Sequence, residues 1–216
     1  MTFERPITFM NKVDSLSLPT IYYIKESKSL FPSDKLKYSI INSKGKKLNR
    51  VKIVDGNFDI SDKKGTQLVE FNLNSIKEQY DLSIHFKKSN NKRSIKIRQG
   101  RLWEGGSVYG IEFFNEKTQE IDYISVLLNI QSYEVQDFTI FDHNFDWNAF
   151  EDYDINGFKD LCDSNVIGMA NKTDSSLLEY KIRIRQNVDT TFIAIVFMYI
   201  LHHAILDYMQ MISEED

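Results

Sequence analysis

The feature that most constrains this chain is its C-terminal run TTFIAIVFMYILHHAILDYMQMI, residues 190–212. From Phe192 to Leu201 every residue is apolar or aromatic, so a helix over this run is apolar on all of its sides. Such a helix is buried either in the core of a large domain or in a membrane. Asn187 or Asp189 can cap its N-terminus, which predicts a helix over 190–212.

The length and polarity of the run argue against a membrane span. The 17 residues from Thr190 to Leu206 carry no formal charge, and they reach only about 25 Å as a helix, whereas a span needs about 20 apolar residues. His202, His203 and Asp207 would also be costly at depth. We therefore expect a central core helix, with a tail anchor and a surface amphipathic helix as the alternatives.

The residues just before the run fit a strand better than the cationic flank of a tail anchor. Lys181, Arg183 and Arg185 alternate with apolar residues, which is the period of a half-buried strand. This alternation predicts a strand that leads into the central helix.

The body of the chain shows the pattern of short strands joined by tight turns. Regularly spaced strands of this kind predict a barrel or sandwich rather than βαβ units. A short helix is expected around residues 156–162. The predicted hairpins cover residues 38–54 with a turn at 43–46, 58–73 with a turn at 62–65, 82–99 with a turn at 89–91, 110–128 with a turn at 115–118, and 166–185 with a turn at 171–174.

Length and composition fit one domain over residues 1–216, in which residues 1–20 form an N-terminal extension. Of the 216 residues 42% are hydrophobic and 27% are charged, which are ordinary globular values. The one cysteine, Cys162, excludes an internal disulfide and a cysteine-cluster metal site. The N-terminus has no apolar core of a secretory signal, so we expect a cytoplasmic protein whose membrane contact is at most peripheral.

Three segments, taken in order, resemble the tubby C-terminal-like superfamily, particularly its small bacterial and LURP-one-related members. They are YYIKESKSLFPSDKLKYSIINSKGKKL (22–48), DGNFDISDKKGTQLVEF (55–71) and YKIRIRQNVDTTFIAIVFMYILHHAI (180–205). The resemblance covers roughly residues 20–210. It implies a mainly β fold, a closed antiparallel barrel of about 10–12 strands around a central hydrophobic C-terminal α-helix. Residues 135–164 depart from it and are interpreted as an acidic-aromatic insertion.

The segment from Ser83 to Trp103 is strongly cationic, with seven basic residues and no carboxylate. Lys96 and Arg98 share one strand face, and clustered cations attract phosphate headgroups. The resemblance implies a lipid-headgroup site here, because eukaryotic tubby domains bind phosphoinositides through basic strand residues. The alternative is a solvated hairpin face. The candidate anion-binding residues are Lys87, Lys88, Lys92, Arg93, Lys96, Arg98 and Arg101.

A second candidate surface lies in residues 136–165, where eight carboxylates against one lysine are interleaved with seven aromatic residues. Aromatic anchors inside an acidic rim fit a basic protein partner, as an immunity or inhibitor protein would have. The alternative is a local aromatic core with solvated carboxylates. The candidate partner-binding residues are Asp142, Asp146, Trp147, Phe150, Glu151, Asp152 and Tyr153.

Motifs for catalysis, cofactors or metals are weak. Gly105–Gly110 has phosphate-loop spacing but lacks the following Lys-Ser/Thr, and His202 and His203 are adjacent rather than four residues apart. A calcium loop from Asp142 is disfavoured because Trp147 stands where glycine is required. We therefore expect a non-enzymatic binding domain without cofactor or metal. Its partner is an anionic lipid headgroup or a basic protein rather than nucleic acid, and a hydrolase is the weakest alternative.

Overall fold

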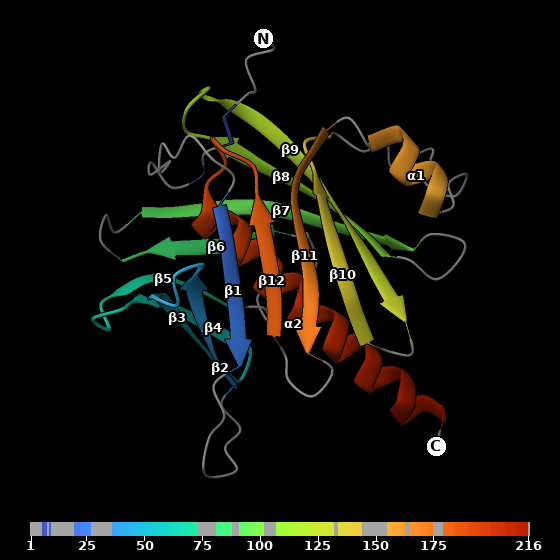
Figure 1. Cartoon of the computed structure of the whole chain (residues 1–216), viewed down its shortest axis with the longest axis horizontal. Helices are drawn as coiled ribbons and strands as arrows, with labels where there is room; N and C mark the ends of the chain where they lie inside the picture. Colours follow the sequence, from blue (N-terminus) through green and yellow to red (C-terminus); the bar gives the residue numbers. More distant parts are fainter. Residues whose placement is uncertain are drawn as a thin grey trace.

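The computed structural model describes residues 6–7, 9, 20–26, 36–72, 81–87, 91–101, 107–131, 134–143, 155–162, 165–174 and 179–215. Figure 1 shows a barrel of strands crossed by one long helix, with a short helix on the outside. The strands are β1 (Thr20–Glu26), β2 (Leu36–Asn42), β3 (Lys47–Val54), β4 (Asn57–Asp62), β5 (Gln67–Asn72), β6 (Asp81–Phe86), β7 (Asn91–Arg101), β8 (Ser107–Asn115), β9 (Glu120–Gln131), β10 (Glu134–Phe141), β11 (Val166–Asp174) and β12 (Glu179–Ile184). The helices are α1 (Ile155–Cys162) and α2 (Thr190–Glu215).

The twelve strands form one closed antiparallel meander. Each strand from β2 to β12 pairs with its neighbours in sequence, and β1 closes the barrel by pairing with both β12 and β2. The predicted mainly β fold, a closed barrel with a hydrophobic C-terminal helix, is thus confirmed. Closure leaves no open sheet edge among these strands.

Two of the predicted turns use the same local device. Asn42 Oδ1 accepts hydrogen bonds from the N–H groups of Lys44 and Lys46. In the same way, Asp62 Oδ1 accepts hydrogen bonds from the N–H groups of Lys64 and Thr66. Each turn contains a glycine with positive φ, Gly45 at 75° and Gly65 at 87°, a conformation that glycine adopts without a Cβ penalty. These polar turns fix the first two hairpins where the sequence predicted them.

The predictions for the later hairpins have mixed outcomes. The turn at 115–118 is confirmed, because β8 ends at Asn115 and β9 begins at Glu120. The turn predicted at 171–174 is wrong, since β11 continues to Asp174. Lys172 and Asp174 pair with Tyr180 and Glu179 of β12, and this pairing outweighs the weak turn preference of the polar residues.

Helix α2 forms the core of the barrel. All ten residues from Phe192 to Leu201 are at most 6% exposed, as expected for a helix that is apolar on every side. Asp189 caps it, because its Oδ1 accepts the N–H groups of Thr191 and Phe192 at 3.0 Å each. No helix in the described part of the chain is long and apolar enough to cross a bilayer.

The predicted N-terminal extension contributes to this core. Ile7 forms a parallel bridge with Val188, and its backbone exchanges hydrogen bonds with Asn187 and Asp189 beside the start of α2. Phe9 is fully buried and stacks on Phe192 with ring centroids 4.8 Å apart. These two residues anchor the N-terminal segment at the start of the central helix.

Helix α1 lies outside the barrel wall (Figure 1). It confirms the short helix expected around 156–162. Its Phe158 is fully buried and makes an edge-to-face contact with Phe141, with ring centroids 5.7 Å apart. Val108 and Leu127, which are cross-strand neighbours, are also buried without belonging to the main core.

Candidate functional site

The predicted basic strand pair corresponds to the hairpin of β6 and β7. On β7, Ile95 and Ile97 are buried in the barrel, whereas Lys96 and Arg98 are exposed on the outer face, together with Lys92. The predicted common face of Lys96 and Arg98 is confirmed by this alternation. We call Lys92, Lys96 and Arg98 the β7 basic face.

Two lysines of this region form ion pairs with acidic side chains on neighbouring strands. Lys96 Nζ lies 2.7 Å from Glu112 Oε1 on β8, and Lys87 Nζ lies 2.8 Å from Glu70 Oε2 on β5. The hydrogen bond from Lys87 is the main cause that lowers the pKa of Glu70 below its usual value. Exposed pairs of this kind add little stability, and they reduce the charge that is available to a ligand.

Lys92 and Arg98 are the cations of the face that are free to meet a ligand. Both are exposed, and neither has a carboxylate partner among the residues the structure describes. In the register of β7 and β8, Arg98 lies opposite Gly110, which has no side chain to cover it. Lys88 lies outside the described residues, as does the side chain of Arg101.

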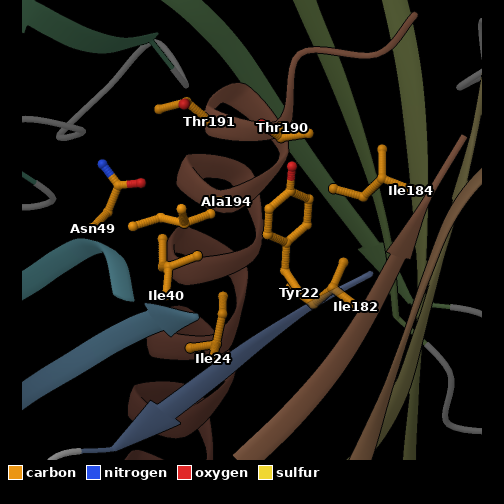
Figure 2. Close-up of a pocket in the computed structure, with 10 residues that line it drawn as sticks. Tyr22, Ile24, Ile40, Asn49, Ile182, Ile184, Thr190, Thr191 and Ala194 are labelled. Carbon is orange, nitrogen blue, oxygen red and sulfur yellow. The ribbon is translucent and has the colours of Figure 1, made fainter. Parts of the chain in front are cut away.

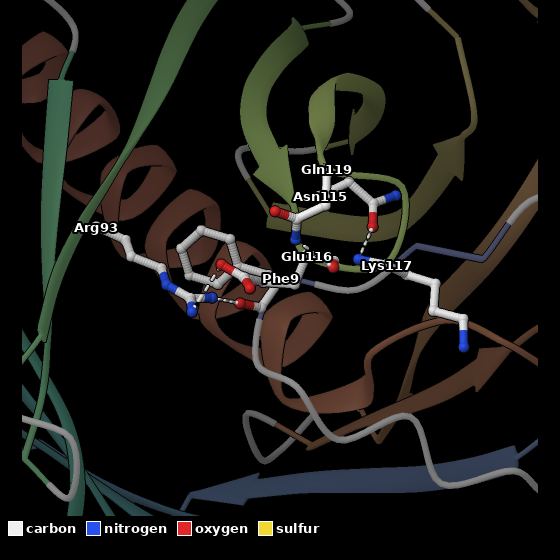
Figure 3. Close-up of polar contacts among 6 residues, drawn as sticks. All are labelled: Phe9, Arg93, Asn115, Glu116, Lys117 and Gln119. Atoms are coloured by element: carbon white, nitrogen blue, oxygen red, sulfur yellow. Dashed lines mark hydrogen bonds and ion pairs between the residues drawn. The ribbon is translucent and has the colours of Figure 1, made fainter.

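Arg93 does not belong to this outer face. Its guanidinium is half-buried, pairs with Glu116 Oε1 at 2.7 Å and donates to the carbonyl oxygen of Phe9. The guanidinium also lies over the rings of Phe9 and Phe86, at 5.7 and 5.1 Å from their centroids. Figure 3 shows Arg93 with Phe9 and Glu116. Through these contacts Arg93 holds the N-terminal segment in place, and its charge is already compensated.

The turn between β8 and β9 is fixed by a buried amide. Asn115 is fully buried, and its Nδ2 donates to the carbonyl oxygen of Pro6 at 2.8 Å and to Asp122 Oδ2 at 2.6 Å. Its Oδ1 accepts the N–H of Lys117 (Figure 3), and its carbonyl oxygen accepts the N–H of Gln119. The sequence predicted a turn here but not this network, because the partners are distant in sequence.

The acidic-aromatic candidate is described only at its two ends. Asp142 lies 3.9 Å from Arg185 and is mostly buried, and Phe141 and Phe158 form the local aromatic contact described above. For these two rings the local-core interpretation applies. The remaining candidates lie outside the described residues: Asp146, Trp147, Phe150, Glu151, Asp152 and Tyr153.

The predicted insertion at 135–164 also begins later than expected. Residues 134–141 form β10, which pairs with both β9 and β11 in the barrel wall. The segment between consecutive barrel strands therefore runs from 142 to 165. The acidic composition of β10 obscured its alternation of Phe138 and Ile140, which are buried, with Asp137 and Thr139.

A small cleft, open to solvent, lies between the barrel wall and the first turns of α2 (Figure 2). Side chains of β1, β2, β3, β12 and the start of α2 line it, and its polar groups are the hydroxyls of Tyr22, Thr190 and Thr191 and the amide of Asn49. Beside these hydroxyls, its described lining contains no carboxylate, imidazole or thiol.

The two histidines of α2 lie at the end of its fully buried stretch. His202 makes an edge-to-face contact with Phe58, and His203 stacks on Tyr199. Burial, and then the neighbouring His203, lowers the pKa of His202 below its usual value of 6.5. Among the described residues no group of three histidine, cysteine or acidic side chains is arranged to hold a metal ion.

Comparisons with known proteins add one similarity. No family model matches the chain, and no curated protein matches it. The X-ray structure of a protein from Arabidopsis thaliana is similar over 86% of this chain and 90% of its own, with 12% sequence identity and a TM-score of 0.46.

Proposed function

We propose that this protein is a non-enzymatic, tubby-like binding domain that engages anionic lipid headgroups through the β7 basic face. The observation that supports it most is the exposure of Lys92 and Arg98 on one strand face without a carboxylate partner in the described part of the chain. Such cations attract phosphate oxygens and anionic lipid surfaces. Under this proposal the protein is cytoplasmic and binds peripherally to the membrane surface.

The closed barrel narrows the ways in which the protein can bind a partner. The twelve paired strands offer no edge to which an extended peptide could add, so the outer face, the loops and the cleft remain as binding surfaces. On the outer face, β7 carries three exposed cations within seven residues. This density of charge favours an anionic ligand.

The ion pairs refine the set of contact residues. Lys92 and Arg98 are the primary contacts, and Lys96 is a secondary contact because it must exchange Glu112 for the ligand. Arg93 stays out of the site because Glu116 and the Phe9 carbonyl oxygen occupy it. The proposed site is therefore smaller than the seven-residue cluster.

Vesicle sedimentation tests this function. We expect the protein to bind phosphatidylcholine vesicles that contain about 30% phosphatidylserine, with an affinity that falls as salt rises, because the contacts are electrostatic. The double variant Lys92→Glu/Arg98→Glu should lose this binding. Lys44→Glu/Lys63→Glu, which makes the same change in net charge at two exposed turn positions, is the matched control and should bind like the wild type. Equal binding of both double variants would refute the proposal.

A further inference from the structure

Two exposed apolar side chains stand next to each other on the outer face beside the β7 basic face. Phe114 on β8 is 37% exposed, and Ile121 on β9 is 51% exposed. They are direct partners in the antiparallel register of these strands. In the described part of the chain only one other large apolar side chain, Met169 at 42%, is comparably exposed, and it lies on β11.

The hairpin that carries this pair is held rigidly. Phe114 and Ile121 flank the turn in which Asn115 is tied to Pro6, Asp122 and Lys117. Gln119 adds a hydrogen bond from its Nε2 to the carbonyl oxygen of Glu116 at 2.8 Å. Two apolar side chains held out on a fixed turn lose little conformational freedom when they are buried, which favours their use as contacts.

The charges around the pair are complementary to a negative surface. Glu112, two residues before Phe114 on the outer face of β8, pairs with Lys96 of β7. Lys92 and Arg98 lie on either side of Lys96 along β7. Lys117 is exposed in the turn itself. Glu120 is exposed as well, and Glu116 is already compensated by Arg93. The charged residues near Phe114 and Ile121 that are not compensated are thus mainly cationic.

We infer that the β8–β9 hairpin enters the membrane surface, with Phe114 and Ile121 in the boundary between headgroups and acyl chains while the β7 basic face contacts the phosphates. This inference rests on the proposed function and makes its partner a membrane surface rather than a soluble anion. Apolar side chains combined with basic neighbours are the composition of reversible membrane contacts. Neither set is strong enough alone, since even one myristoyl chain binds a bilayer only marginally.

The test compares two serine substitutions on vesicles that contain phosphatidylcholine and phosphatidylserine. Phe114→Ser/Ile121→Ser should weaken binding by about tenfold or more, because it removes most of the apolar contact, while its salt dependence stays that of the wild type. Met169→Ser removes an equally exposed apolar side chain from β11 and should bind like the wild type. Circular dichroism and thermal melting of each variant verify that the fold is intact.

The outcomes separate this inference from the function on which it rests. If Lys92→Glu/Arg98→Glu loses binding and Phe114→Ser/Ile121→Ser keeps it, the headgroup contact stands and the insertion is refuted. If only the serine variant loses binding, the proposed electrostatic function is refuted. Light scattering covers a further possibility: a wild-type dimer that becomes monomeric in the serine variant, with vesicle binding unchanged, would make the pair a self-association surface and overturn the inference.

Discussion

At the scale of single residues, His202 makes the stability of this protein depend on pH. Its pKa in the folded protein is lowered from 6.5, first by burial and then by His203. Below pH 6.5 the unfolded chain therefore binds more protons at this residue than the folded protein does. The stability that His202 contributes is complete above pH 6.5 and is lost as the pH falls towards its lowered pKa.

We predict that His202→Gln flattens this dependence. Between pH 7 and pH 5 the free energy of unfolding of the wild type should fall more steeply than that of the variant, because glutamine takes up no proton. Urea denaturation at a series of pH values measures both curves. Parallel curves for the two proteins would show that His202 does not cause the dependence.

Single contacts also explain which site residues the sequence could predict. Alternation with Ile95 and Ile97 placed Lys96 and Arg98 correctly on the outer face. The same alternation puts Arg93 on the side of Ile95 and Ile97, but no local pattern could show its partners Phe9 and Glu116, which are 84 and 23 positions away in the sequence. Charge clusters in a sequence thus identify a region, and the ion pairs in the fold decide which members remain available.

At the scale of elements, the start of α2 is joined to the N-terminal segment. The Asp189 carboxylate caps the helix, and the Asp189 N–H donates to the carbonyl oxygen of Ile7 from the N-terminal segment. Asp189 is only 1% exposed, so water cannot replace these bonds. Asp189 therefore supports both the helix and the N-terminal segment.

Replacing this cap should destabilise the protein measurably. We predict that Asp189→Ala lowers the free energy of unfolding by about 1–2 kcal/mol, because the N–H groups of Thr191 and Phe192 lose their acceptor. Asp189→Asn retains a side-chain oxygen and should cost clearly less. Chemical denaturation of the three proteins measures the difference, and equal losses in the two variants would contradict the capping role.

The elements differ in how well their own residues encode them. Helix α2 and the first two hairpins were predictable, because an unbroken apolar run and the Asn42 and Asp62 turns specify them locally. Strand β10 and the end of β11 were not, because their polar residues resemble a loop and only pairing with neighbouring strands makes them strands. For these segments the structure depends on hydrogen bonds to neighbouring strands and not on the local sequence.

At the scale of the whole molecule, the net charge of −4 is compatible with binding to an anionic surface. Charges farther than about 10 Å are largely screened at 0.1 M salt, so the cations at the contact dominate over acidic residues elsewhere. In the proposed orientation, β7 and the β8–β9 hairpin face the lipid.

The most direct test of this account is a titration of binding against the phosphatidylserine fraction of phosphatidylcholine vesicles. Binding of the wild type should rise steeply as the fraction increases from zero to about 40%, because each cation at the surface contributes about 1 kcal/mol. Binding of Lys92→Glu/Arg98→Glu should stay near zero throughout. A wild type that ignores the phosphatidylserine fraction, or a charge-reversed variant that follows the wild-type curve, would contradict the account.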